Sequence, residues 1–243
     1  MKVVRRPAKS VRLGVALAVA GALALPALAS ADGGKVTGKI TFDGTPPAPT
    51  KIKLDADPVC VAAHTGPIDS EEVVVANGAV KNVFVRVTEG LGDKKFPPST
   101  EPAVIDQHGC QYIPHVIGVQ VGQPLKFTTS DQTLHNVHGM PKKNAQFNFA
   151  MPKFVKQKDT TFTTPEVMVA VKCDVHPWMN GWVGVVDNPF FAVSGADGTY
   201  TIQNLPPGEY TIEAWQEKLG TQTAKVKVDG CGTATADFKF KNP

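Results

Sequence analysis

The strongest chemical signal in this chain comes from a cysteine, two histidines and a methionine in two separate segments. Cys173, His176 and Met179 follow one another at intervals of three, and His135 lies upstream. A thiolate, two imidazoles and a thioether form a restricted donor set, in which the sulfur ligands favour copper. A cysteine and two histidines with a more distant methionine hold the mononuclear type 1, or blue, copper ion of electron transfer. The four residues therefore predict one copper site.

The neighbouring residues indicate how this donor set is positioned. The apolar run Val167–Lys172 predicts a buried strand that ends at Cys173. The two ligands that follow would lie in a tight loop, which Pro177 stiffens by fixing its own φ. Asn136, beside the upstream histidine, would hydrogen-bond across to the ligand loop and hold it in place.

Alternatives to this ligand set stay open. His138 lies three positions after His135, so in an extended strand the two face opposite sides and only one should reach the metal. We favour His135 and keep His138 as the alternative ligand. Zinc could instead use Cys173 with His135, His138 and His176. The thioether of Met179 argues against zinc, because a thioether is a poor zinc ligand. Met179 could instead serve as core packing.

These motifs resemble those of the cupredoxins, the small blue copper proteins, and in particular amicyanin and plastocyanin-like members. The segment Leu134-His-Asn-Val-His138 is similar to the Pro-His-Asn-Val-His segment of amicyanins, with leucine in place of the usual proline. The segment Cys173-Asp-Val-His-Pro-Trp-Met179 is similar to their Cys-x-x-His-Pro-x-Met loop. The resemblance covers roughly residues 102–188 and implies a Greek-key sandwich. It also implies that the edge of His176 is exposed and forms an electron-exit patch with Trp178.

The rest of the chain predicts an all-β protein, because short alternating strands are separated by turn signals. The segment Val193–Trp215, with Asp-Gly-x-Tyr-x-Ile and Leu-Pro-Pro-Gly-x-Tyr motifs, resembles carboxypeptidase regulatory-like, or transthyretin-like, β-sandwiches. Val36–Ile40 is similar to the first strand of such a domain. We therefore expect a second sandwich built from both flanks of the copper domain. The expected divisions are residues 1–31, 32–100, 101–189 and 190–243.

The N-terminal residues 1–31 are typical of a secretory signal peptide: a basic start, the uncharged run Leu13–Leu25 and small residues before Ala31. We expect a periplasmic or secreted protein, with no membrane span after cleavage because the run is too short. The formal net charge of +3 would become −2, since residues 1–31 carry five Lys and Arg and no acid. Nothing in this balance indicates nucleic-acid binding.

The chain has four cysteines, and an oxidising compartment favours pairing. With Cys173 assigned to the metal, we expect a Cys60–Cys110 disulfide, because both residues lie in turn-rich stretches outside the ligand loop. The sequence does not assign a role to Cys231.

The resemblance implies a carrier of single electrons between redox partners, such as a cytochrome c or a periplasmic oxidoreductase. No catalysis is expected, because no second histidine cluster offers a catalytic metal site. Two other functions fit the residues. One is periplasmic copper binding and delivery, which uses the same ligands. The other is a cell-surface β-sandwich module that binds a protein or polysaccharide.

Overall fold

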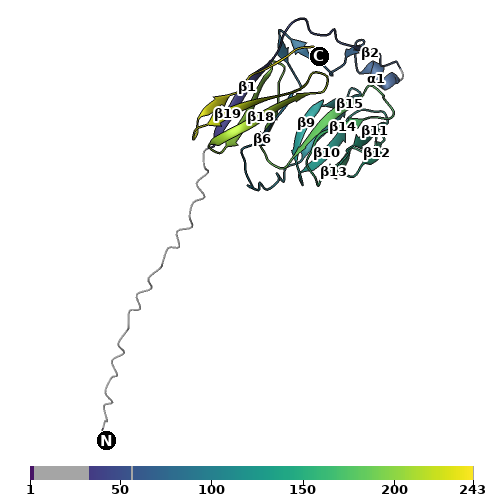
Figure 1. Cartoon of the computed structure of the whole chain (residues 1–243). Helices are drawn as coiled ribbons and strands as arrows, with labels where there is room; N and C mark the ends of the chain where they lie inside the picture. The colour runs from purple at the N-terminus through teal and green to yellow at the C-terminus, as the bar shows by residue number, and fades with distance from the viewer. Residues whose placement is uncertain (3–32, 56, 243) are drawn as a thin grey trace. The chain divides into compact units, whose positions relative to one another are not determined.

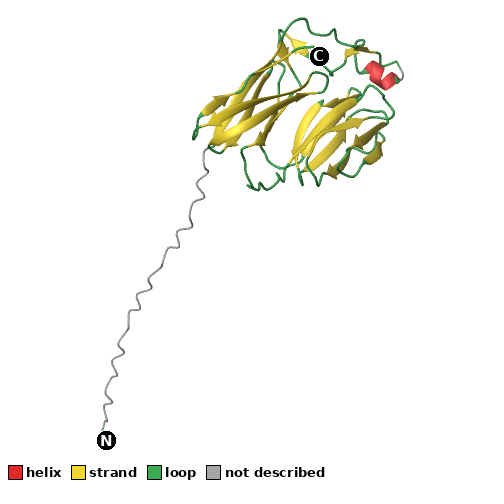
Figure 2. Cartoon of the chain, in the orientation of Figure 1, coloured by secondary structure: helices red, strands yellow, loops and turns green. Residues whose placement is uncertain are grey.

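The computed structural model describes residues 1–2, 33–55 and 57–242, and these residues form an almost wholly β protein (Figures 1 and 2). The prediction of an all-β chain is confirmed. The predicted signal peptide, apart from its first two residues, lies outside the described residues. Among the described residues, no helix has the length and apolar character needed to cross a membrane.

The two ends of the described chain meet in one β-sandwich, here called the terminal sandwich. Its strands are β1 (Gly34–Phe42), β4 (Val75–Ala76), β5 (Ala79–Val80), β6 (Phe84–Glu89), β16 (Phe191–Val193), β17 (Thr199–Leu205), β18 (Gly208–Gln216), β19 (Gly220–Val228), β20 (Thr233–Thr235) and β21 (Phe238–Phe240). One sheet has the order β17-β1-β5-β4, with β20 and β21 also paired to β1, and the other has the order β16-β6-β18-β19. Both sheets contribute to one apolar core.

The residues between these ends form the central sandwich. Its strands are β7 (Ala103–His108), β8 (Gln111–Ile113), β9 (Val116–Gln120), β10 (Pro124–Thr129), β11 (His135–Met140), β12 (Phe147–Met151), β13 (Gln157–Thr161), β14 (Glu166–Lys172) and β15 (Asn180–Val186). One sheet has the order β13-β10-β7-β8 and the other has the order β12-β11-β14-β15-β9. The divisions at residues 100 and 189 stay predictions.

Alternation of apolar and polar residues explains how the central sheets face their shared core. In β10, Leu125, Phe127 and Thr129 are buried, while the residues between them are more exposed. Successive strand residues point to opposite faces, so every second side chain reaches the core. In β14, Val169 and Val171 point inward just before the chain reaches the predicted ligand loop.

A short segment, residues 51–69, covers one end of the central core and is here called the cap segment. It contains β2 (Lys51–Ile52), α1 (Pro58–Ala62) and β3 (Ile68–Asp69), and β2 pairs antiparallel with β3. Asp57 caps α1 by accepting the N–H of Val59, and Pro58 occupies the first turn, where its missing N–H costs nothing. Leu54 and Cys60 are buried within the core of the central sandwich.

A smaller apolar cluster joins strands of the two sandwiches, centred on Phe84, Val116 and Val186. Gly184 on β15 allows this close approach, since a Cβ there would lie only 2.5 Å from Cζ of Phe84.

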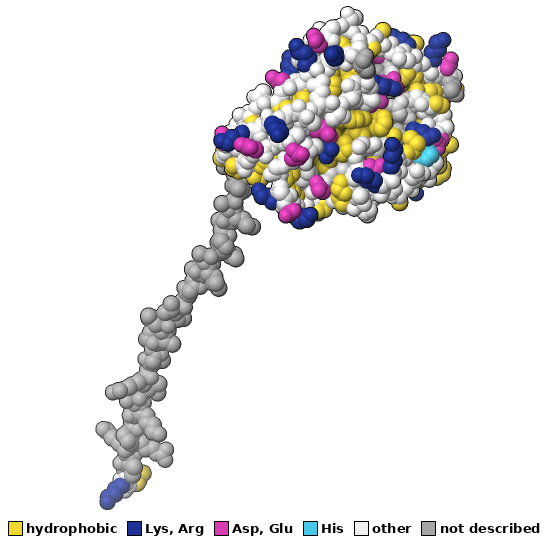
Figure 3. All heavy atoms as spheres, viewed as in Figure 1, with side chains coloured by type: hydrophobic (Ala, Val, Ile, Leu, Met, Phe, Trp, Pro, Cys, Tyr) yellow, Lys and Arg dark blue, Asp and Glu magenta, His cyan; other side chains and the backbone are white. Residues whose placement is uncertain are grey.

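The face shown in Figure 3 mixes basic and acidic side chains around scattered apolar ones. On that face, no broad field of one sign is present.

Candidate metal centre

Adjacent strands bring the predicted ligands together at one end of the central sandwich. β11 begins at His135, and β14 ends immediately before Cys173. The two strands pair antiparallel, with His138 opposite Lys172, so the start of β11 lies beside the residues that follow β14. The ligand loop then leads from Cys173 into β15.

Three of the four predicted ligands meet at one buried point. The Nδ1 atoms of His135 and His176 are 3.1 Å apart, and Sγ of Cys173 lies 3.9 Å from Nδ1 of His176. One donor atom from each of the three residues lies within 4.8 Å of the others, and each residue is at most 1% exposed. Two nitrogens about 2.0 Å from a shared ion are about 3 Å apart at a bond angle near 100°. The spacing therefore fits a shared metal.

Backbone hydrogen bonds close the ligand loop and join Met179 to Cys173 and His176. The N–H of Cys173 donates to the carbonyl of Met179 at 3.0 Å, and the N–H of Met179 donates to the carbonyl of His176 at 2.9 Å. Met179 is 1% exposed and packs in the same core cluster as Cys173. With its thioether added, the donor set is the combination that suits copper.

The surroundings of Cys173 favour its thiolate form. The backbone N–H groups of Asn136 and His176 point at Sγ, at 3.3 and 3.4 Å. Burial alone would raise the pKa of the thiol, but hydrogen bonds from His135, His176 and these two N–H groups lower the pKa to about 6. A thiolate is the form in which cysteine binds metal.

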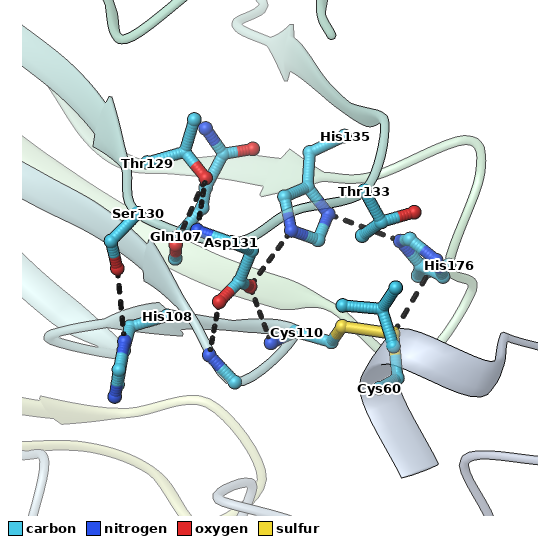
Figure 4. Close-up of polar contacts among 12 residues, drawn as sticks. Cys60, Gln107, His108, Cys110, Thr129, Ser130, Asp131, Thr133, His135 and His176 are labelled. Atoms are coloured by element: carbon cyan, nitrogen blue, oxygen red, sulfur yellow. Dashed lines mark hydrogen bonds and ion pairs between the residues drawn. A yellow bond between two sulfur atoms is a disulfide. The ribbon is translucent and has the colours of Figure 1, made fainter. Parts of the chain in front are cut away.

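His135 is held by a carboxylate on the side away from the metal point. Its Nε2 lies 2.9 Å from Oδ2 of Asp131 (Figure 4). The same carboxylate accepts two backbone N–H groups, that of Gly109 at Oδ1 and that of Cys110 at Oδ2. Burial alone would lower the pKa of His135, but hydrogen bonds to Asp131 and Cys173 raise it to about 9. A carboxylate behind a ligand histidine orients the ring and increases its basicity.

His176 has the same kind of support from a distant part of the chain. Its Nε2 lies 3.1 Å from Oδ2 of Asp57 and 3.6 Å from Sγ of Cys60, both in the cap segment. The edge of His176 was expected at the surface, together with Trp178, and this expectation is wrong. His176 is 1% exposed because the cap segment covers it, and Trp178 is half-buried, with its Nε1–H donated to the carbonyl of Cys110.

The structure also places the other residues that were singled out. The side chain of Asn136 accepts the backbone N–H of Asp174 at 3.0 Å, across the ligand loop. Pro177 is exposed at the turn of that loop. His138 points away and pairs with Asp174, Nδ1 to Oδ2, at 2.9 Å. It is absent from the buried donor group, so the zinc set that includes it does not assemble among the described residues.

The structure pairs Cys60 with Cys110, the pair favoured on sequence grounds. The bridge joins α1 in the cap segment to the turn between β7 and β8, beside His176 (Figure 4). It therefore fastens the cap segment over the predicted ligand.

Sequence reasoning missed the two carboxylates that support the histidines. Asp131 stands four residues before His135, and that proximity was a usable signal. Asp57 carries a local signal only for α1, since an aspartate followed by proline is typical of a helix start. It is separated from His176 by 119 residues, so only the folded chain reveals the contact.

Neither a family model nor a curated protein matches this chain. Solved structures similar to it include an oxidised proline-to-alanine mutant of amicyanin, with 26% identity over 36% of this chain and 84% of that one, and a TM-score of 0.32. A purple cupredoxin from Nitrosopumilus maritimus is 21% identical over 34% of this chain and 98% of its own, with a TM-score of 0.30. A copper-containing nitrite reductase from Thermus scotoductus is 23% identical, with a TM-score of 0.30. Here 41% of this chain matches 25% of the reductase.

The central sandwich has the two packed sheets and the single donor group that the sequence resemblance led us to expect. Two packed sheets hold the four donors at one end, with one histidine at a strand start and the others in a single loop.

Proposed function

We propose that this protein is an exported type 1 copper protein that carries single electrons between redox partners. The observation that carries the proposal is the convergence of His135, Cys173 and His176 at one buried point. Copper held there would supply reversible one-electron chemistry between its two oxidation states. The chain would contribute a closed, pre-formed donor set that changes little between those states.

Each residue has a separate part in this proposal. Cys173 would provide the strong thiolate bond and most of the electronic coupling to the protein. His135 and His176 would supply two nitrogen ligands, and Met179 would supply a thioether that tunes the potential. Every group of His, Cys, Asp and Glu able to hold a metal among the described residues includes His135 or His176, so the candidate donors gather in one region.

The decisive experiment adds Cu(II) to purified protein and records the visible absorption and electron paramagnetic resonance spectra. We expect an intense blue band and a narrow copper hyperfine splitting. Cys173→Ser should lose both while the β fold, measured by circular dichroism, persists. Cys231→Ser, in the loop between β19 and β20, is the matched control and should keep them. A Cys173→Ser protein with an unchanged spectrum would exclude the proposal.

A second candidate function is the holding or delivery of copper. The burial of His176 under the cap segment favours it, because a covered ligand limits direct contact with a redox partner. The two functions predict different rates of electron exchange. Rapid oxidation of the Cu(I) protein by cytochrome c would favour the carrier, whereas slow electron exchange together with transfer of copper to an apoprotein would favour holding.

We also propose that the terminal sandwich is transthyretin-like and serves as a scaffold. The two motif tyrosines support this class, since both are buried and both anchor loops. The hydroxyl of Tyr200 donates to the carbonyl of Ala236 at 2.6 Å, and that of Tyr210 donates to the carbonyl of Pro206 at 2.7 Å.

A further inference from the structure

The cap segment touches a predicted copper ligand at the atom that faces away from the metal point. The Nε2 of His176 lies 3.1 Å from Oδ2 of Asp57, and the ring is 1% exposed. With Nε2 hydrogen-bonded to a carboxylate, the proton of a neutral imidazole resides on Nε2, and Nδ1 is left with its lone pair. Nδ1 is the atom that faces His135 and Cys173.

The carboxylate of Asp57 is itself held in place on several sides. Its Oδ1 accepts the backbone N–H of Val59 at 2.7 Å, and its Oδ2 accepts the hydroxyl of Thr133 at 2.6 Å. Thr133 lies two residues before His135, so the loop that carries one histidine also supports the carboxylate behind the other. A group fixed by three contacts is a rigid support rather than a chance surface neighbour.

The two histidines are supported in the same way. Asp131 lies behind His135 as Asp57 lies behind His176, each at the Nε2 atom. The Cys60–Cys110 disulfide links the two supports, because Cys60 lies in the helix that Asp57 caps and the N–H of Cys110 donates to Asp131 (Figure 4). The disulfide therefore joins the two segments that hold the carboxylates of Asp57 and Asp131.

We propose that Asp57 is a positioning residue for the metal centre: it holds His176 with Nδ1 toward the copper and adds negative charge behind the ligand. The inference rests on the proposed copper site. Two carboxylates behind the two imidazoles stabilise the more highly charged Cu(II) and so lower the reduction potential. The cap segment, pinned by the disulfide and by Asp57, also closes the ring edge of His176 to water.

The charge is tested by Asp57→Asn, with Asp55→Asn as the matched control. Asparagine is as good a helix cap as aspartate, because its one oxygen can still accept the N–H of Val59. The change removes the charge, and its NH2 group stands where Oδ2 accepted the N–H of His176. Asp55 is an exposed aspartate of the same cap segment. The potential of Asp57→Asn should rise above that of the wild type, while that of Asp55→Asn should not change. Equal potentials in all three proteins would overturn the role of the charge.

The hydrogen bond is tested by NMR of histidines labelled with ¹⁵N, in the copper-free and the Cu(I) proteins. The Nε2–H protons of His135 and His176 should both exchange slowly with water. Asp57→Ala should accelerate exchange at His176 at least tenfold and leave His135, which is held by Asp131, unchanged. An Asp57→Ala protein that keeps slow exchange at His176 would overturn the positioning role.

These readouts separate this inference from the proposed function. If the wild type binds no copper but shows the two slow protons, the function fails and the contact stands. If the wild type is blue but neither Asp57 variant differs from it in potential or exchange, the function stands and the role of Asp57 is wrong.

Discussion

The side-chain oxygen of Asn136 accepts the backbone N–H of Asp174 at 3.0 Å, which ties the start of β11 to the ligand loop. The same side chain donates its Nδ2–H to Asn148 on β12. His135 immediately precedes Asn136, and Cys173 immediately precedes Asp174. The bond between Asn136 and Asp174 therefore couples one predicted ligand to the other.

Removing this tie should weaken copper binding. Asn136→Ala loses this bond and the two that its Nδ2 donates, to Asn148 and to the carbonyl of Phe149. We expect copper affinity to fall about 10–100-fold, the usual cost of losing a group that orients metal ligands. Competition with a chelator measures the change. Asn148→Ala loses its bonds to the side chains of Asn136 and Asp174 but keeps the bond from the N–H of Asp174 to Asn136, so it should have a smaller effect. An Asn136→Ala protein with wild-type affinity would show that the tie does not orient the ligands.

His138 should be dispensable for the metal. It points away from the donor group and pairs with Asp174, so His138→Ala should keep the blue spectrum. His135→Ala should lose it. The reverse result would make His138 the ligand and would require β11 to shift its register by an odd number of residues.

Met179→Leu should keep the colour and raise the reduction potential. The blue colour would come from the thiolate, whereas the thioether would add electron density that favours Cu(II). Leucine nearly conserves the volume of this buried side chain, so stability should change by less than about 1.5 kcal/mol. Voltammetry and urea unfolding check the two effects. A lower potential would contradict the role of Met179 as a copper ligand.

Loss of the disulfide should lower the stability of the protein but leave the copper ligands in place. The bridge spans 50 residues, and replacing Cys60 and Cys110 together by alanine should lower the free energy of unfolding by about 2–5 kcal/mol. The variant should still turn blue with Cu(II), since neither cysteine is a predicted copper ligand. Urea unfolding of the copper-free proteins gives the comparison, and an unchanged midpoint would count against a structural role for the bridge.

Glu166 predicts a pH-dependent contribution to stability. Its carboxylate accepts the backbone N–H groups of Lys142, Lys143 and Asn144, and these bonds outweigh burial and lower its pKa from the ordinary value of 4.5. The folded state therefore holds the proton less tightly than the unfolded state. The stabilisation is full above the ordinary pKa and is lost as the pH falls through the lowered one.

Replacement of this carboxylate tests whether its contribution to stability is lost as the pH falls. Glu166→Gln should cost about 1–3 kcal/mol at pH 7, because several N–H groups lose a charged acceptor. The difference from the wild type should shrink as the pH falls below about 4. Glu101→Gln, at an exposed position, is the control and should have little effect at either pH. A difference that grows toward acid would contradict the assignment.

Local spacing explains why much of the fold and the metal centre could be predicted. Cys173, His176 and Met179 lie within seven residues, so the geometry of one loop decides how they meet. Alternation in strands such as β10 and β18 decides which side chains face the core. The choice of His135 over His138 follows from the same alternation.

The remaining features depend on contacts between distant segments. No local pattern shows that the cap segment covers His176, so the expected exposed edge was wrong. The contact between Asp57 and His176 joins residues 119 positions apart, and it exists only because α1 packs on the central core. Short sequence motifs thus determine the types of the donors and their order along the chain. Burial and the placement of charge behind each ligand arise from long-range packing, which no short stretch of residues encodes.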